Sequence, residues 1–426
     1  MLITKKQNYL KRKTLKKTAL LALLPLLLLG VGESSVAGFS EPSLDHRIVG
    51  FQMSAYDESS LRASGNAQSN DRDRYSKNIS QFYLSLPVTE KMIVESTIVS
   101  ESISGAFPIY IQPTDIRLDS AGEPINPDPL VVMSSVTEED VRRKLSTRTT
   151  YFHDSGSVFG SAGISKEDDY RSIFAEVGGV LHFNKRANAI DFGFGGSSDN
   201  VTPLAENNPS SAASHGRESL SAYAGVSQII DRNSTVHFGL SFTWENGFLS
   251  DPYQFVGSYS DDIFIQTPDS RPDERAQLVW NLSYRLFLPA RSGALHADYR
   301  LYQDNWDVVS HTLDVSWNHS LPNNWQIIPG LRYYSQSEAD FYDPYFLVSG
   351  NDGLEGSSYS SSDFRLSPYG VISLRFKVIK DIENWRITLL AENYDSDQDL
   401  GLGNVKTVNP ALVDFTFFSI GVDHKF

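Results

Sequence analysis

The sequence contains no cysteine among its 426 residues. This absence excludes disulfide bonds, a thiolate nucleophile, a lipid-modified cysteine and the attachment motif of c-type haem. We therefore expect a fold that needs no covalent cross-link, and we expect no cofactor.

Two further features are scarce. Beyond residue 37, no apolar run approaches the ~18 residues needed for a membrane-spanning helix. Basic residues are outnumbered, because 37 Lys and Arg face 52 Asp and Glu, which gives a formal net charge of −15. Without a basic surface to neutralise phosphates, nucleic-acid binding is disfavoured.

The N-terminus carries the marks of export. Seven Lys and Arg residues between positions 5 and 17 precede the apolar run 19–31, and Ser35, Val36 and Ala37 supply the small residues of a cleavage site. The alternative is a membrane anchor, but the run is short and has no basic residues on its far side. We predict a cleavable signal peptide at 1–37 and a single domain at 38–426, whose formal charge would be −21.

The last residues of the chain alternate in polarity. Phe418, Ile420, Val422, His424 and Phe426 share one side of an extended strand. This pattern resembles the terminal strand of a Gram-negative outer-membrane β-barrel. In such proteins the final aromatic residue, here Phe426, is a signal to the barrel-insertion machinery.

The remaining sequence has the same period of two. We predict sixteen strands of an up-and-down antiparallel transmembrane β-barrel, a fold of the all-β class. They span approximately 47–56, 77–87, 90–102, 141–153, 157–166, 170–184, 187–198, 217–230, 234–246, 274–288, 294–305, 309–319, 324–337, 363–378, 384–395 and 412–426.

The loop lengths favour a barrel over a soluble β-sandwich, which would also alternate. Connections after even-numbered strands are short and turn-like, whereas most connections after odd-numbered strands are long. Short periplasmic turns and long extracellular loops are typical of outer-membrane barrels. The long connections are 57–76, 103–140, 199–216, 247–273, 338–362 and 397–411.

The longest of these connections, 103–140, contains five prolines. We expect neither helix nor regular strand in it. It could fold into the lumen as a constriction or stand on the cell surface, and the sequence leaves both open.

Charged residues are predicted on the face opposite the apolar one, where they would line the lumen. Both signs occur, so one interpretation is a structural lattice of ion pairs and the other is a weakly selective lining for a solute. The lumen-lining candidates are Glu176, Arg285, Asp298, Arg300, Asp314, Arg332, Arg365, Arg375, Arg386 and Glu392.

We expect no enzymatic activity, because nucleophile motifs are missing. The sequence has no Gly-x-Ser-x-Gly elbow. His215 and Ser219 could be mistaken for the residues of an outer-membrane lipase, but His215 lies at a loop–strand junction and the pair lacks a defined arrangement of base and orienting group.

Two loop elements could bind something. Glu167, Asp168 and Asp169 could hold Ca²⁺, although such a run is more often a solvated loop tip, so the metal remains unknown. The repeated Asp-Pro-Tyr element, ending at Tyr253 and Tyr345, either folds the loops off the rim or forms a docking patch of exposed aromatics. The docking candidates are Tyr253, Phe341, Tyr342 and Tyr345.

Several segments together resemble an uncharacterised exported family, the domain of unknown function 3570. They are Lys166-Glu-Asp-Asp-Tyr-Arg-Ser172, Phe248-Leu-Ser-Asp-Pro-Tyr253, Arg271-Pro-Asp-Glu-Arg275, Leu295-His-Ala-Asp-Tyr-Arg300, Ser310-His-Thr312, Leu331-Arg-Tyr-Tyr-Ser-Gln-Ser337, Ala339-Asp-Phe-Tyr342 and Ser362-Asp-Phe-Arg-Leu-Ser367. The family's Ser-Gly-Ala-Ser-Pro element is present here as Ser104-Gly-Ala-Phe-Pro108, in which Phe107 replaces the second serine. The resemblance implies a barrel fold and association with a small lipoprotein or a flavinylated redox protein.

These observations predict an outer-membrane protein in contact with lipid. The first hypothesis is a channel or conduit for a small solute or for a redox or lipoprotein partner. The alternative is a structural barrel whose surface loops dock a lipoprotein or flavoprotein.

Overall fold

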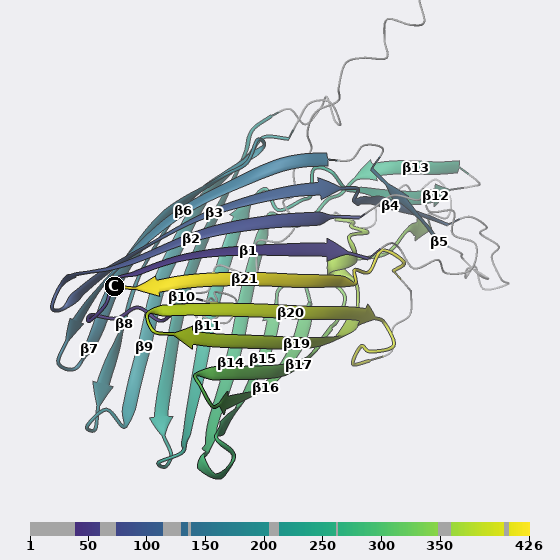
Figure 1. Cartoon of the computed structure of the whole chain (residues 1–426). Helices are drawn as coiled ribbons and strands as arrows, with labels where there is room; N and C mark the ends of the chain where they lie inside the picture. The colour runs from purple at the N-terminus through teal and green to yellow at the C-terminus, as the bar shows by residue number, and fades with distance from the viewer. Residues whose placement is uncertain are drawn as a thin grey trace, which may run out of the picture.

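The computed structural model describes residues 39–59, 74–113, 129–134, 138–203, 213–260, 263–347, 359–403 and 409–426. Sixteen antiparallel strands form one closed barrel (Figure 1). In sheet order they are β1 (Ile48–Glu58), β2 (Ser76–Thr89), β3 (Met92–Gly105), β6 (Glu138–His153), β7 (Gly156–Lys166), β8 (Tyr170–Phe183), β9 (Asn188–Val201), β10 (His215–Ile229), β11 (Ser234–Gly247), β14 (Glu274–Leu288), β15 (Gly293–Asp304), β16 (Val309–Leu321), β17 (Trp325–Gln336), β19 (Tyr369–Ile382), β20 (Trp385–Asp397) and β21 (Phe415–Lys425).

The predicted barrel and its strand number are confirmed. The first and last strands close it, because β1 pairs with β21 from Ile48↔Lys425 to Glu58↔Phe415. The terminal residue takes part as well: the backbone N–H groups of Arg47 and Phe426 each donate to the other's carbonyl at 3.0 Å. No sheet edge remains unpaired in the barrel, which is the condition for crossing a lipid layer with strands.

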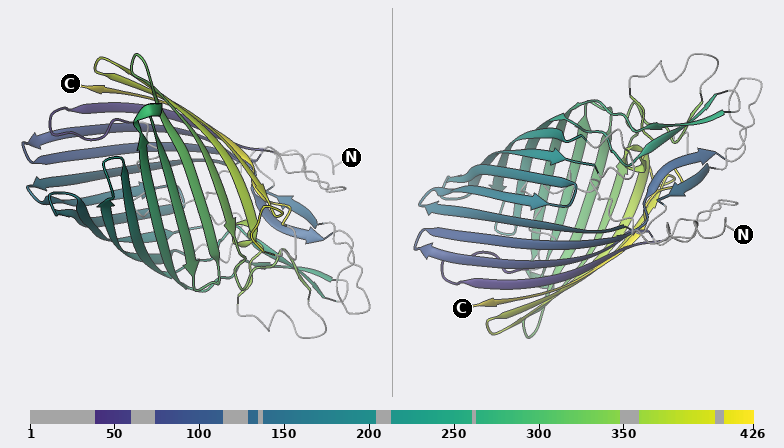
Figure 2. Two further views of the ribbon diagram at one scale, coloured as in Figure 1. Left: turned by 90° about the horizontal axis from the view of Figure 1, so that it is seen from below. Right: turned by 90° about the horizontal axis from the view of Figure 1, so that it is seen from above.

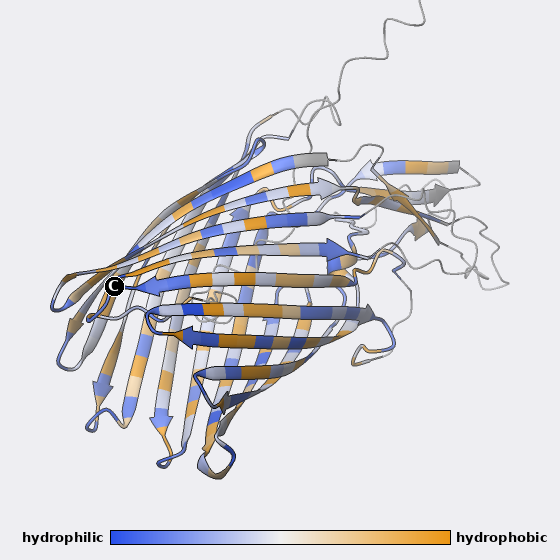
Figure 3. Cartoon of the chain, in the orientation of Figure 1, coloured by the Kyte–Doolittle hydropathy of each residue, from blue (hydrophilic) through white to orange (hydrophobic). Residues whose placement is uncertain are grey.

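The outer face of the barrel is apolar. On β11, Phe238 and Phe242 are 45% and 46% exposed, whereas Ser241 between them is 2% exposed. The same alternation runs along the other strands (Figure 3). Exposed phenylalanine, leucine and valine side chains around a closed barrel are suited to lipid rather than to water. None of the helices within the described residues has the length and apolarity that a membrane span requires.

The two ends of the barrel differ as predicted. At one end the strands are joined by short turns, several with left-handed residues such as Asn323 (φ 60°) and Asn324 (φ 58°). Asparagine tolerates this backbone conformation better than most residues do. At the other end, opposite the C-terminus, extra strands extend beyond the barrel (Figures 1 and 2). We call these the short-turn end and the long-loop end.

The extra strands belong to the long connections. β4 (Pro108–Pro113) and β5 (Pro129–Met133) form a hairpin, and β12 (Phe255–Ser260) lies between β13 (Ile263–Pro268) and β18 (Phe346–Leu347) in a second small sheet. The expectation that the 103–140 connection contains no regular strand was wrong. Pro108, Pro113 and Pro129 stand at strand termini, where a missing N–H does not interrupt the ladder.

Residues before β1 enter the barrel at the short-turn end. The Phe39 ring stacks on Tyr83 with centroids 5.2 Å apart, and the backbone N–H of Ser40 donates to Asp423 at 3.3 Å. Gly50 is required beneath this ring, because a Cβ there would lie 2.5 Å from a Phe39 ring carbon. Phe39 therefore narrows the lumen at this end. The predicted signal peptide, residues 1–37, lies outside the described residues.

One strand begins later than predicted. Residues 364–366 form the 3₁₀ turn η5 (Phe364–Leu366), and β19 starts at Tyr369. Asp363 caps this turn by accepting a hydrogen bond from the backbone N–H of Arg365 at 3.0 Å. Arg365 therefore lies at the long-loop end and not on a lumen-facing strand, which corrects its predicted position.

Candidate functional site

Nine of the ten lumen candidates lie on strands, on the face opposite the exposed apolar residues. Asp314, for example, follows Leu313, which is 45% exposed, and Arg375 lies between Leu374 and Phe376, which are 61% and 49% exposed. Because successive side chains point to opposite faces, these charged residues point into the barrel.

Most of these charges are paired. Asp314 accepts from Arg332 on β17 at 3.0 Å and from Arg375 on β19 at 2.8 Å. Arg285 meets Asp298 at 2.8 Å, and Glu392 accepts from the hydroxyl of Ser373 at 2.5 Å. This geometry favours the lattice interpretation, in which little net field remains inside the lumen.

The remaining candidates have other contacts. Arg386 on β20 lies directly opposite Asp381 on β19 and bonds its carboxylate at 2.7 Å. The Arg300 guanidinium lies 6.0 Å from the centre of the Tyr302 ring. Ser161 donates to Glu176 at 3.5 Å, a weak bond.

We expect the substitution Asp314→Asn to change ion selectivity. It removes the carboxylate that Arg332 and Arg375 share, so two positive charges lose their partner within the lumen. The anion-to-cation permeability ratio, measured from reversal potentials under a salt gradient, should rise several-fold. Asp231→Asn, in an exposed turn, is the control and should leave the potential unchanged.

The sequence does not predict a polar network that lies on the inner face of β9, β10 and β11. The Tyr223 hydroxyl lies 3.0 Å from Nε2 of His237, which lies 3.3 Å from Asp191 Oδ2. Gly225 makes room for all three, because a Cβ there would come within 2.5–2.6 Å of an atom of each.

A second ionic cluster lies at the long-loop end and consists of Asp251, Asp269, Arg271, Asp363 and Arg365. Arg271 bonds Asp269 at 2.8 Å and Asp363 at 2.7 Å. Arg365 bonds Asp363 and, at 2.7 Å, Asp251. The Asp363 side chain is fully buried. These five residues come from the β11–β14 and β17–β19 connections, and we call them the rim ion cluster.

The rim ion cluster fixes its own charge states. Burial alone would raise the pKa of Asp363, but Arg365 and Arg271 outweigh burial and hold the pKa below its ordinary value. Arg365 responds in the opposite direction: burial disfavours its charge, yet Asp363 and Asp251 raise its pKa. The Asp363–Arg365 pair is therefore ionised throughout the physiological pH range.

Contacts between loops cross the barrel mouth. Gln254, in the β11–β14 connection, donates to the Pro108 carbonyl of the β3–β6 connection at 3.2 Å. Arg365 of the β17–β19 connection bonds Asp251 of β11–β14, and Phe364 packs against Ala106, Val131 and Met133 of β3–β6.

These three connections are spread around the circumference of the sixteen-strand ring. A closed triangle of contacts among them must pass over the opening. We call this interlocked layer, from the β3–β6, β11–β14 and β17–β19 connections, the cap.

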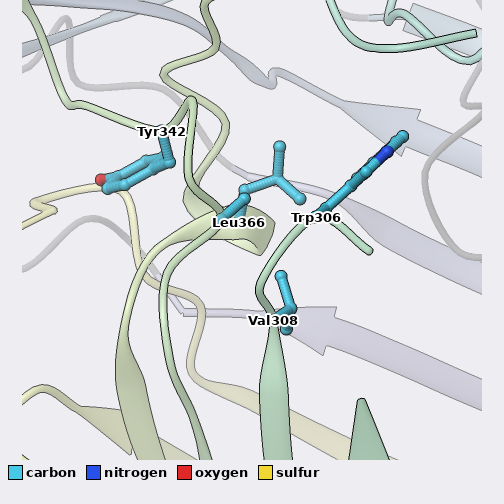
Figure 4. Close-up of a cluster of buried hydrophobic side chains, with 5 residues drawn as sticks. Trp306, Val308, Tyr342 and Leu366 are labelled. Carbon is cyan, nitrogen blue, oxygen red and sulfur yellow. The ribbon is translucent and has the colours of Figure 1, made fainter. Parts of the chain in front are cut away.

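An apolar cluster supports the cap from the β15–β16 and β17–β19 connections. It comprises Trp306, Val308, Ala339, Tyr342 and Leu366 (Figure 4). The Tyr342 hydroxyl accepts from Asn409 of the β20–β21 connection at 2.7 Å. Burying these side chains anchors loops that would otherwise be solvated.

The docking candidates do not form the exposed surface patch that the docking interpretation requires. Tyr253, Tyr342 and Tyr345 are only 6%, 7% and 6% exposed, and Phe341 packs on the Trp306 cluster. The prediction treated them as exposed, but their rings fill the spaces between loops. The Asp-Pro-Tyr element therefore folds the loops together, which was the simpler of the two interpretations.

Asp343, within the second Asp-Pro-Tyr element, provides a pH test of the cap. Burial, with Glu338 nearby, raises its pKa to about 6. Because the folded loop favours the protonated carboxyl, its stability is fully present below the ordinary pKa of 3.8 and is lost as pH rises through about 6. Between pH 4 and 7 we expect the protection of amides at residues 338–347, measured relative to intrinsic exchange, to fall by about 1–2 kcal/mol after allowing for solvent screening. Asp343→Asn should remove this loss of protection, and an unchanged profile in that variant contradicts the assignment.

His215 and Ser219 do not form a catalytic pair. His215 begins β10 and stacks on Phe248 with ring centroids 4.4 Å apart. Four residues along a strand correspond to about 13 Å. The two side chains are therefore too far apart along the strand for a hydrogen bond.

Several solved structures are similar to this chain at low sequence identity. They include the siderophore receptor PirA from Pseudomonas aeruginosa (11% identity, TM-score 0.39, covering 84% of this chain and 57% of that one). Another is OccK1 (OpdK) from the same organism (8% identity, TM-score 0.38, covering 89% and 98%). A bacterial polysaccharide outer-membrane secretin matches at 8% identity, with a TM-score of 0.43 and coverage of 89% and 98%.

The chain spans little more than half the length of the siderophore receptors it matches. No curated protein matches it. A family model described as "Protein of unknown function (DUF3570)" matches residues 18–417.

Proposed function

The chain belongs to the DUF3570 family, whose description assigns no activity, and we propose from its geometry that it is an outer-membrane conduit for small polar solutes. The apolar outer face suits an outer-membrane bilayer, with the short-turn end in the periplasm and the long-loop end outside. A sixteen-strand barrel is wide enough to hold an aqueous path.

The observation that carries this proposal is the polar lumen beneath a cap. Charges of both signs are paired along β14–β20, so the lining is hydrophilic and nearly neutral. Such a lining would pass small uncharged or weakly charged solutes without strong selection by sign. The cap limits the size of what enters from outside.

Planar-bilayer recording tests the conduit. Purified protein should give small, discrete conductance steps, and proteoliposomes should swell in small neutral sugars but not in large ones. Bilayers and liposomes without the protein provide the baseline. A correctly folded barrel that neither conducts nor permits swelling contradicts the proposal.

A further inference from the structure

A second group of acidic side chains lies at the long-loop end, in addition to the rim ion cluster. Asp140 on β6 and Glu167 and Asp169 in the turn between β7 and β8 each bring a carboxylate oxygen to within 4.8 Å of the others. All three are buried, at 4%, 4% and 2% exposed. Of the two interpretations open for Glu167, Asp168 and Asp169, a solvated loop tip and a Ca²⁺ site, the first does not fit, because only Asp168 of the three is exposed.

Two of these carboxylates are each held through one oxygen. Arg142 Nε lies 3.3 Å from Glu167 Oε1, and the Tyr253 hydroxyl donates to Asp169 Oδ2. The second oxygens, Glu167 Oε2 and Asp169 Oδ1, are buried and accept no hydrogen bond. Leaving such atoms unsatisfied is costly, and each one in a native protein calls for an explanation.

Arg142 is a cation in contact with Glu167, and it is shared, because it also approaches Glu101 at 4.0 Å. Asp169 is bonded by a neutral phenol.

We propose that Asp140, Glu167 and Asp169 bind one divalent cation of the calcium class. Hard oxygen ligands suit Ca²⁺, whose bonds of about 2.3–2.6 Å allow two ligand oxygens to lie up to about 5 Å apart. The three carboxylate oxygens lie within 4.8 Å of one another, so one such ion could contact all of them.

The bound ion would join three parts of the long-loop end. It would tie β6 to the β7–β8 turn, and Tyr253 would link Asp169 to the β11–β14 connection of the cap. This site does not depend on conduction, since binding can be measured on the purified barrel alone.

Calorimetric titration of chelator-treated protein with Ca²⁺ tests the site. We expect one ion per chain, and at least tenfold weaker binding in Glu167→Gln and Asp169→Asn. Asparagine retains an oxygen that can accept the Tyr253 hydroxyl. Asp168→Asn, in the same turn but with an exposed side chain, is the matched control and should bind as the wild type does.

A second measurement leaves the carboxylates intact in case those variants fail to fold. Terbium bound at the site should emit on tyrosine excitation, because Tyr253 contacts Asp169. Ca²⁺ should displace the bound terbium and so reduce this emission. The substitution Tyr253→Phe should also reduce it. The proposal is overturned if wild-type protein binds no Ca²⁺, if terbium bound to the wild type gives no emission that Ca²⁺ reduces, or if folded Glu167→Gln and Asp169→Asn bind normally.

Discussion

Asp363→Ala is expected to open the cap and increase conductance. The substitution leaves Arg271 and Arg365 buried without the carboxylate that both contact. Removing one partner of a buried ion pair typically costs about 3–5 kcal/mol. Because the other members of the rim ion cluster belong to loops, this cost should fall on the cap rather than on the barrel.

Two readouts separate these parts of the molecule. Hydrogen exchange should accelerate at residues 249–271 and 359–367, while strands β14–β17 stay protected. Single-channel steps should become larger and noisier. Arg186→Ala is the control, because Arg186 lies in the exposed β8–β9 turn at the short-turn end, where it donates to the Asp154 carbonyl at 3.3 Å. Wild-type conductance together with wild-type exchange in Asp363→Ala would show that the cluster does not hold the cap.

Val177→Arg is expected to impair assembly of the barrel. Val177 lies midway along β8 on the outer face and is 58% exposed. An arginine facing lipid near the bilayer midplane costs about 2–4 kcal/mol. The amount of folded protein in outer membranes, measured as the heat-modifiable band on electrophoresis, should fall sharply.

Ser161→Arg is the matched substitution for the inner face. Ser161 pairs with Glu176, the neighbour of Val177, and its hydroxyl lies 3.5 Å from that carboxylate. An arginine there would meet an acidic partner in the lumen, so assembly should be close to normal. Equal yields for Val177→Arg and Ser161→Arg would contradict the assignment of an outer, lipid-facing side and an inner, lumen-facing side to these strands.

The barrel was predictable because its main determinants are local. Each strand alternates with period two, and the final strand reads Phe418, Ile420 and Val422 on its lipid face. Loop length sorted by strand parity then distinguished a barrel from a sandwich. All sixteen predicted strands correspond to strands of the closed sheet.

The cap was not predictable from local pattern, because it is made of contacts between distant segments. Asp363 and Arg365 alternate with Phe364 and Leu366 as a strand would, yet Asp363 bonds the Arg365 backbone and turns the chain into η5. Tyr253 is an ordinary loop aromatic until Asp169, 84 residues earlier, meets its hydroxyl.

One signal in the sequence did point to the cap. The segments that carry the family resemblance supply Asp251, Arg271, Asp363 and Arg365 of the rim ion cluster, together with Glu167 and Asp169. The resemblance marked these residues without indicating that they meet, because only the closed sheet brings their loops to one end of the molecule.

Cross-linking across the mouth tests the central claim most directly, and the absence of native cysteine makes the experiment clean. Phe107 and Tyr253 come from connections six strands apart, yet their ring centroids lie 6.5 Å apart. The double variant Phe107→Cys, Tyr253→Cys should be joined by a short thiol-specific reagent in intact outer membranes. The control is the double variant Phe107→Cys, Asp231→Cys, whose two cysteines lie at opposite ends of the barrel and should not be cross-linked. If the first pair fails to cross-link in folded protein, the loops do not span the barrel, and the account of a capped conduit is contradicted.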